Sequence, residues 1–430
     1  MNSREIALNI LVKLDRDRAY VNKLLAAEFR NADLKPVDKA FINELVLGCV
    51  KNRYLLDYII MQFSKVKIKK MSVWVRNILE LGVYQIIFLD KVPSSAACNE
   101  SVKLGRRYAN RSCGFINGVL RNISRGAESV RFPDSSGDIL EYLSINYSFP
   151  KWMVKKLVDD YSYEFCEDIL KSANAVSSAF IRANALKAPE NESNFINILR
   201  ADGIDASPIE ELKGCYAVKG ALDLHNSDTY KRGLFSVQNR SSQLASIILE
   251  PKPGQLVIDV CAAPGGKTTH IAELMGNKGK VIAFDFHEHK ISQINEAAQR
   301  LGITIIEACR FDSTMCKPEL IGKADRVLVD APCSGLGVMN SKPDIRWHRE
   351  EGDIAELNEI QSKILSSSAK YVKSGGFLVY STCTILKDEN ERRVSRFLSE
   401  HSDFELVDER KLFTHIDGGS GFYIAKLKRT

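Results

Sequence analysis

Apolar positions recur with a helical period through the first 130 residues. Ile6, Ile10 and Leu14 fall on one face of a helix, and the same spacing returns around Leu45. No stretch of this region alternates between apolar and polar residues with the two-residue period of a half-buried strand. The pattern therefore predicts an all-α N-terminal domain over residues 1–130.

A polar segment separates this region from a mixed one. Residues 131–140 contain a proline, a glycine, two serines and two aspartates, a composition typical of a linker. Beyond it, helical patterns at 151–160 and 192–201 flank a short apolar run at 179–183. We expect a small α+β region over residues 141–230.

From residue 235 onward, apolar runs of strand length alternate with longer helical segments. Such alternation is typical of an α/β fold with a mainly parallel sheet and helices on both faces. In these sheets, ligands bind outside the carboxyl ends of the strands. The seven expected strands, within a domain of residues 235–430, are 256–260, 281–285, 303–307, 326–330, 376–381, 404–407 and 422–427.

Charge is unevenly distributed between these regions. Residues 1–130 hold 22 Lys/Arg and 12 Asp/Glu, whereas the remaining 300 residues hold 38 and 42. This basic excess, which includes four lysines at 65–70, favours a polyanionic partner, although a solvated face without a partner has the same composition. No apolar run approaches the roughly 20 residues that cross a bilayer. The charged N-terminus is unlike a signal peptide, so we expect a cytoplasmic protein without a membrane partner.

A turn of small residues follows the first strand of the α/β region. The sequence Asp259-Val-Cys-Ala-Ala-Pro-Gly-Gly-Lys-Thr268 lets a backbone approach a ligand closely before a helix begins. A phosphate-binding P-loop would need a glycine at position 261, where the chain has a cysteine. Asp285 ends the second strand and Asp312 follows the third, as expected for contacts to the ribose and adenine of a cofactor. A simple tight turn and helix-capping carboxylates are the alternatives.

Two cysteines follow the next two strands. The fourth strand leads into Asp330-Ala-Pro-Cys-Ser-Gly335 and the fifth into Ser381-Thr-Cys-Thr384. Because these strands are usually neighbours in a doubly wound sheet, we expect Cys333 and Cys383 at one mouth, together with Asp330. A thiolate that adds to carbon 6 of cytosine makes carbon 5 nucleophilic toward a methyl donor, and a nearby carboxylic acid would stabilise the adduct. For Cys383 alone, a buried inert thiol is the alternative.

With these motifs in order, residues 235–430 resemble the RNA 5-methylcytosine methyltransferases, a Rossmann-like family that uses S-adenosylmethionine. The resemblance implies that Cys383 is the nucleophile, that Cys333 assists release of the covalent adduct, and that Asp330 lies beside both cofactor and base. DNA cytosine methyltransferases instead use the cysteine of a Pro-Cys pair, which here would be Cys333. The cofactor-binding residues implied are Cys261, Ala262, Ala263, Pro264, Gly265, Gly266, Lys267, Asp285, Asp312 and Asp330.

Residues 1–130 resemble the NusB-type helical RNA-binding domains, on the segments 38–48 and 93–104. A NusB-like domain joined to such a methyltransferase implies a monomeric enzyme that methylates 16S ribosomal RNA, either free or in early particles. Another RNA such as tRNA, a non-catalytic RNA-binding module and a nicotinamide-dependent oxidoreductase are the alternatives.

The region 141–230 is similar to the connecting RNA-binding region of the same family, with Pro150-Lys-Trp152 and Arg182. After Gly337 the chain departs from the family pattern, since Val-Met-Asn-Ser-Lys-Pro343 stands where relatives carry more arginine and a histidine. Arg346 and Trp347 in the loop 340–349 would help to hold the target base, or would lie on a plain surface loop.

Overall fold

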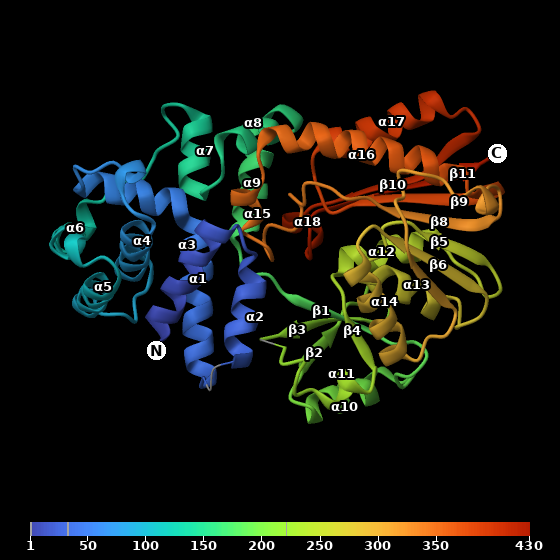
Figure 1. The fold of residues 1–430 in the computed structure, drawn as a ribbon, viewed down its shortest axis with the longest axis horizontal. Coiled ribbons are helices and arrows are strands. Elements are labelled where there is room, and N and C mark those ends of the chain that lie inside the picture. Colours follow the sequence, from blue (N-terminus) through green and yellow to red (C-terminus); the bar gives the residue numbers. More distant parts are fainter. Residues whose placement is uncertain (1, 32–33, 221) are drawn as a thin grey trace. The chain divides into compact units, whose positions relative to one another are not determined.

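The computed structural model describes residues 2–31, 34–220 and 222–430. The chain divides into two compact units (Figure 1). The first comprises Met1–Ala175 and the segment Ser341–Arg349, and we call it the helical unit. The second comprises Val176–Asn340 and Glu350–Thr430, and we call it the sheet unit. Residues 141–175 therefore fold with the N-terminal helices, whereas residues 176–230 fold with the large sheet.

The described residues of the helical unit form helices and no strands, as the apolar period predicts. Ile6, Ile10 and Leu14 are all buried, in one core with residues of the third and fourth helices. Local sequence fixes several helix starts: the Asn2 side chain accepts a hydrogen bond from the Glu5 N–H (2.9 Å). The α-helices are α1 (Ser3–Asp17), α2 (Val21–Asn31), α3 (Pro36–Phe63), α4 (Val73–Phe88), α5 (Ser94–Tyr108), α6 (Cys113–Arg125), α7 (Ile139–Tyr147), α8 (Lys151–Asp160), α9 (Tyr163–Asn174) and α15 (Ile345–His348).

The sheet unit begins with a small antiparallel sheet of strand order β2-β3-β1-β4. The expected strand at 179–183 is confirmed as β1 (Ala179–Ala183), and α10 (Glu192–Ala201) packs Phe195 into the core of this sheet. The sequence pattern missed the other three strands because they are only three to five residues long and partly exposed. They are β2 (Asp205–Pro208), β3 (Cys215–Lys219) and β4 (Phe235–Val237), and the short helix α11 (Asp228–Lys231) lies between the last two.

The large sheet has seven strands in the order β10-β11-β9-β8-β5-β6-β7. Five neighbouring strands, from β9 to β7, are parallel, and β11 and β10 add an antiparallel edge, so the predicted mainly parallel seven-stranded sheet is confirmed. The strands are β5 (Leu256–Asp259), β6 (Lys280–Asp285), β7 (Ile306–Arg310), β8 (Ala324–Asp330), β9 (Val372–Thr382), β10 (Phe404–Leu412) and β11 (Phe422–Arg429).

Helices cover both faces of the large sheet (Figure 1). On one face, Ile248, Ile271 and Leu301 of three helices share a core with the sheet. On the other face, Leu365 and Phe397 of two further helices share a second core with it. The first set is α12 (Arg240–Leu249), α13 (Gly266–Leu274) and α14 (Glu288–Leu301), and the second is α16 (Glu351–Ala369) and α17 (Glu391–Glu400); α18 (Thr414–Asp417) precedes β11.

One expected strand is displaced along the chain. The strand predicted at 303–307 is β7 at Ile306–Arg310, because α14 ends on Gly302 in a left-handed conformation (φ 76°) and the chain then needs three residues to reach the sheet. Within the described part of the chain, no helix is long and apolar enough to cross a membrane.

Candidate active site

The turn after β5 is shaped for close approach of a ligand. Its backbone is fixed by bonds from the Ala262 N–H to the Phe284 carbonyl (2.9 Å) and from the Gly265 N–H to the Ala262 carbonyl (2.8 Å). Gly265 has a positive φ of 98°, and a Cβ there would lie 3.2 Å from Cα of Ile294. Only glycine meets both conditions, so the turn can bring backbone N–H groups to a bound molecule at the start of α13.

Asp259, the last residue of β5, was not among the predicted site residues. Its carboxylate is fully buried, and Oδ2 accepts a hydrogen bond from the Thr268 hydroxyl (2.8 Å). Oδ1 is buried without a hydrogen-bond partner among the described residues. Burial raises the pKa of Asp259 to about 7. A buried carboxylate oxygen without a partner fits the ammonium group of an amino acid moiety, which S-adenosylmethionine carries.

The two carboxylates predicted to contact a cofactor follow neighbouring strands. Asp285 ends β6, is buried, and accepts hydrogen bonds from the N–H groups of Ala263 (3.2 Å) and His287 (3.1 Å). It therefore also fixes the turn after β5. Asp312 follows β7, is exposed, and accepts hydrogen bonds at Oδ1 from the Thr314 N–H and hydroxyl. The Asp312 Oδ1 bonds make a local turn, which leaves Oδ2 as the oxygen for a ligand.

The two predicted thiols converge. β8 and β9 are parallel neighbours, and Asp330 is paired in register with Ser381. The loops that follow place Sγ of Cys333 3.4 Å from Sγ of Cys383. Their hydrogen bond and the burial of Cys333 raise the pKa of the Cys333 thiol well above its ordinary value. Either sulfur can be the donor of this hydrogen bond, so the Cys333 S–H can donate to Cys383 when the Cys383 sulfur is a thiolate.

Backbone contacts tie the two cysteine loops together. The Ala331 N–H donates to the Ser381 carbonyl and the Gly337 N–H donates to the Cys383 carbonyl, each at 2.9 Å. A Cβ on Gly337 would lie 2.0 Å from the Gly421 carbonyl oxygen and 2.8 Å from that of Cys383. Residue 337 must be glycine for these chains to pass so closely. The separation of the sulfurs is thus set by the sheet and by these contacts.

A lysine links the cofactor turn to the thiol site. Lys267, at the start of α13, places Nζ 2.7 Å from Asp330 Oδ2, and its side chain is largely buried. The Ser381 hydroxyl donates to Asp330 Oδ1 (2.8 Å). Both oxygens of Asp330 are therefore held, so its position between the turn and the thiols is well defined.

Glu389 is a second residue that sequence reasoning missed. It is fully buried in the short turn between β9 and α17, and it accepts hydrogen bonds from Ser334 N–H (2.9 Å), the Ser334 hydroxyl (2.5 Å) and Gln361 Nε2 (2.9 Å). The Ser334 hydroxyl also lies 2.7 Å from the Thr384 hydroxyl. The Glu389 carboxylate thus holds Ser334, the residue after Cys333, and the Ser334 hydroxyl in turn contacts Thr384, the residue after Cys383. Glu389 follows Cys383 by only six residues, but the local sequence does not indicate that its carboxylate reaches Ser334, which is 55 residues away.

The segment 341–349 folds with the helical unit. The Arg346 guanidinium is fully buried within the helical unit and donates to Asn174 Oδ1 (2.8 Å). The Trp347 indole donates to the Val50 carbonyl (2.9 Å). The interpretation of Arg346 as part of a plain surface loop is therefore wrong, whereas the contact of this segment with a target base stays a prediction. Apolar contacts and backbone acceptors of the helices hold the Arg346 and Trp347 side chains, which the local sequence could not indicate.

Arg182 of the connecting region is not exposed to a phosphate. It lies on β1 with 3% of its side chain exposed and pairs with Glu273 of α13 through Nη2 (2.7 Å) and Nε (3.2 Å). It also donates to the Gly266 carbonyl (2.9 Å) at the first residue of α13. Arg182 therefore supports the helix that begins at the cofactor turn.

A glycine turn and acidic residues at neighbouring strand ends, on a sheet with this strand order, define a Rossmann-like methyltransferase that depends on S-adenosylmethionine. Comparison with known proteins agrees. Residues 246–428 match the family described as 16S rRNA methyltransferase RsmB/F, residues 1–125 match the NusB family, and residues 149–225 match the ferredoxin-like domain of RsmF/B-like methyltransferases.

Relatives match along the whole chain. The probable ribosomal RNA small subunit methyltransferase B of Bacillus subtilis is 37% identical, over 99% of this chain and 98% of its own. The Synechocystis protein of the same name is 34% identical over 100% of both chains. The crystal structure of PH0851 has a TM-score of 0.84 and 28% identity over 100% of this chain and 99% of its own. The chain belongs to the RsmB/F methyltransferase family.

Proposed function

We propose that this enzyme transfers a methyl group from S-adenosylmethionine to carbon 5 of a cytosine in 16S ribosomal RNA. The observation that carries the proposal is the 3.4 Å separation of the Cys333 and Cys383 sulfurs beside Asp330 and Lys267. The relatives named as small subunit methyltransferases support the substrate. The protein acts as a cytoplasmic monomer on free rRNA or on an early particle.

The cofactor is held by the turn 261–267 and the acidic residues beside it. Asp285 accepts from the ribose hydroxyls, Asp312 accepts from the adenine amino group, and Asp259 pairs with the ammonium group. When bound, S-adenosylmethionine supplies an electrophilic methyl group. Lys267 and Asp330 connect this turn to the thiol site through their 2.7 Å ion pair, so that methyl donor and base meet at one edge of the sheet.

Cys383 is the nucleophile. After it loses its proton to solvent, its thiolate forms a bond to carbon 6 of cytosine, and the electron pair of the 5,6 double bond moves toward carbon 5 and the ring. Asp330, as a carboxylic acid, donates a hydrogen bond to ring nitrogen 3, and the Lys267 ammonium stabilises the negative charge that develops on the ring. Carbon 5 then forms its bond to the methyl group as the bond from that group to the sulfonium sulfur breaks, so that S-adenosylhomocysteine is the leaving group.

Cys333 assists release of the product. The proton on carbon 5 passes to water, its electron pair restores the 5,6 double bond, and the bond from carbon 6 to the Cys383 sulfur breaks. Because the pKa of Cys333 is raised, its thiol remains a proton-bearing donor beside the leaving sulfur. A hydrogen bond from Cys333 to that sulfur stabilises the thiolate as it departs.

Tritiated methyl transfer into unmodified 16S rRNA tests the proposal. We expect incorporation that is lost in Cys383→Ala, and bisulfite sequencing should place it at one cytosine. Parallel reactions with deproteinised rRNA, assembly particles and bulk tRNA identify the substrate. Incorporation into tRNA alone would contradict the rRNA assignment, and no incorporation into any of them would indicate a non-catalytic RNA-binding module.

A further inference from the structure

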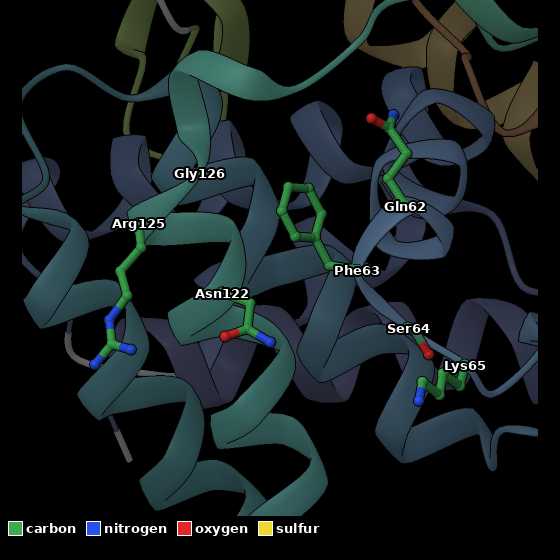
Figure 2. A pocket seen from close by; sticks show the side chains of 7 residues that line it. All are labelled: Gln62, Phe63, Ser64, Lys65, Asn122, Arg125 and Gly126. Carbon is green, nitrogen blue, oxygen red and sulfur yellow. The ribbon is translucent and has the colours of Figure 1, made fainter.

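Two segments of the helical unit lack acidic residues altogether. Residues 58–79 contain five Lys/Arg, residues 101–127 contain six, and neither segment contains an aspartate or a glutamate. The structure brings parts of both segments to one hollow of about 580 Å³ (Figure 2). We call it the α3–α6 hollow, because its lining comes from the C-terminal ends of these helices. It is lined by Gln62, Phe63, Ser64, Lys65, Asn122, Arg125 and Gly126.

Two cations of the α3–α6 hollow are available to a ligand. Lys65 and Arg125 are exposed, and among the described residues neither forms an ion pair or a side-chain hydrogen bond. Three other cations of the same segments are neutralised: Arg76 pairs with Asp57 (2.6 Å), Lys103 with Glu100 (2.6 Å) and Arg107 with Glu5 (2.5 Å). Because no lining residue is acidic, an anion bound in the hollow meets two positive charges and no repulsion.

An aromatic ring lines the same hollow. Figure 2 shows the Phe63 ring between Asn122 and Gln62. Phe63 is half-buried, and a Cβ on Gly126 would lie 3.1 Å from its ring, so the glycine leaves room for the ring in its present place. Base rings stack on such side chains regardless of sequence.

Two amides complete the α3–α6 hollow in different ways. The Gln62 amide is occupied: it donates to the Arg131 carbonyl (2.8 Å) and accepts from the Arg131 N–H (3.0 Å). It therefore fixes the wall where the chain leaves α6. The Asn122 side chain is exposed, with donor and acceptor positions that match those on the edge of a base.

We propose that the α3–α6 hollow binds one nucleotide of a single-stranded segment of the RNA. The Phe63 ring stacks on the base, Lys65 and Arg125 hold the phosphates on either side, and Asn122 hydrogen-bonds to the base edge. The inference rests on the proposed function for the nature of the partner, and it adds a contact site that is separate from the thiol site. Two cations with an aromatic ring and an amide match a nucleotide more closely than an acidic peptide, which offers no ring to stack.

Fluorescence anisotropy with the full-length protein tests this site. The probe is an unstructured fluorescein-labelled RNA of ten nucleotides, compared with an RNA duplex of the same length. For the double charge reversal Lys65→Glu with Arg125→Glu, we expect affinity for the single strand to fall at least about tenfold and the salt slope to fall by about 1.4, at 0.7 per phosphate contact. Lys155→Glu, an exposed lysine on α8, is the matched control and should change affinity less than about twofold.

A substitution of the ring separates stacking from charge. Phe63→Leu keeps an apolar side chain against Gly126 but removes the aromatic face. Since base stacking contributes about 1–3 kcal/mol, affinity for the single strand should fall about 5- to 150-fold with the salt slope unchanged. Thermal unfolding of each variant checks that the helical unit remains folded.

Three results would overturn the proposal: charge-reversal variants that bind as tightly as Lys155→Glu, equal losses for duplex and single strand, or a Phe63→Leu variant with wild-type affinity. The first excludes the site, and the other two reduce it to a basic surface without a nucleotide pocket. Methyl transfer is measured separately. If the wild-type protein methylated no RNA, the proposed function would fail, whereas the binding comparison would still decide the role of the α3–α6 hollow.

Discussion

The buried carboxylate of Glu389 offers a sharp test of how the two thiols are held together. It accepts three hydrogen bonds, two of them from Ser334, the residue after Cys333. The substitution Glu389→Gln preserves the size of the side chain and removes its charge. The amide oxygen of glutamine can still accept from the Ser334 N–H and from Gln361, and its NH2 group can donate to the Ser334 hydroxyl, which then donates to Thr384. The second N–H of that NH2 group is then a buried donor without an acceptor among these contacts.

The magnitude follows from those contacts. A buried donor left without an acceptor costs about 1–3 kcal/mol. A cost of about 1.4 kcal/mol in the transition state corresponds to a factor of ten in rate. If this free-energy cost falls on the placement of the Cys333 loop during the reaction, kcat falls about 10- to 100-fold. The KM for S-adenosylmethionine should stay within about twofold of wild type, because the cofactor turn is held by Asp285 and by its own backbone.

Methyl-transfer kinetics with separate titrations of RNA and S-adenosylmethionine measure these parameters. Asp388→Asn is the matched control, because it removes a carboxylate one residue away whose ion pair with Arg392 lies at the surface. The rate at which Cys383 is alkylated, followed by mass spectrometry, reports the thiol geometry independently of turnover. This rate should differ from wild type in Glu389→Gln and not in Asp388→Asn. The reasoning is refuted if Glu389→Gln retains wild-type kcat, or if both variants lose the same activity.

Three further predictions concern buried charges. Because the pKa of Asp259 is raised to about 7, binding of S-adenosylmethionine, measured by calorimetry, should tighten several-fold between pH 6 and 7.5, and Asp259→Asn should remove this dependence. Burial lowers the pKa of His270 well below 6.5, so the free energy of unfolding should fall as pH drops below 6.5, by up to about 1.4 kcal/mol per pH unit. In urea unfolding measured over this pH range, the free energy of unfolding should depend less on pH for His270→Gln than for the exposed control His289→Gln. Arg182→Met leaves Glu273 buried without its cation and should cost about 3–5 kcal/mol in the free energy of unfolding, much of it restored by adding Glu273→Leu; an unchanged unfolding midpoint would contradict this.

The sequence could predict the large sheet because its central strands, such as β5, β6 and β8, are largely buried and appear as continuous apolar runs. The meeting of Cys333 and Cys383 followed from the same pattern, since adjacent parallel strands deliver their ends to one edge. By contrast, β2 to β4 are only three to five residues long and each has an exposed end, so their composition is hard to distinguish from that of loops.

Long-range polar contacts were beyond sequence reasoning. Arg182 and Arg346 have the charge expected of RNA-contacting residues, but both are buried by partners distant in the sequence. Glu389 looks like a surface carboxylate, although three donors from two other segments bury it. In each case the role depends on which chain segment covers the side chain, which local spacing does not encode.

The roles of the two thiols are tested most directly by trapping the covalent adduct. Cys333→Ser and Cys383→Ser are each incubated with 16S rRNA and S-adenosylmethionine, and denaturing electrophoresis separates protein from protein–RNA adduct. Cys333→Ser should accumulate the adduct, because Cys383 still attacks carbon 6 while release is slowed, and Cys383→Ser should form none. An adduct that accumulates in Cys383→Ser and is absent from Cys333→Ser would show that the nucleophile is Cys333.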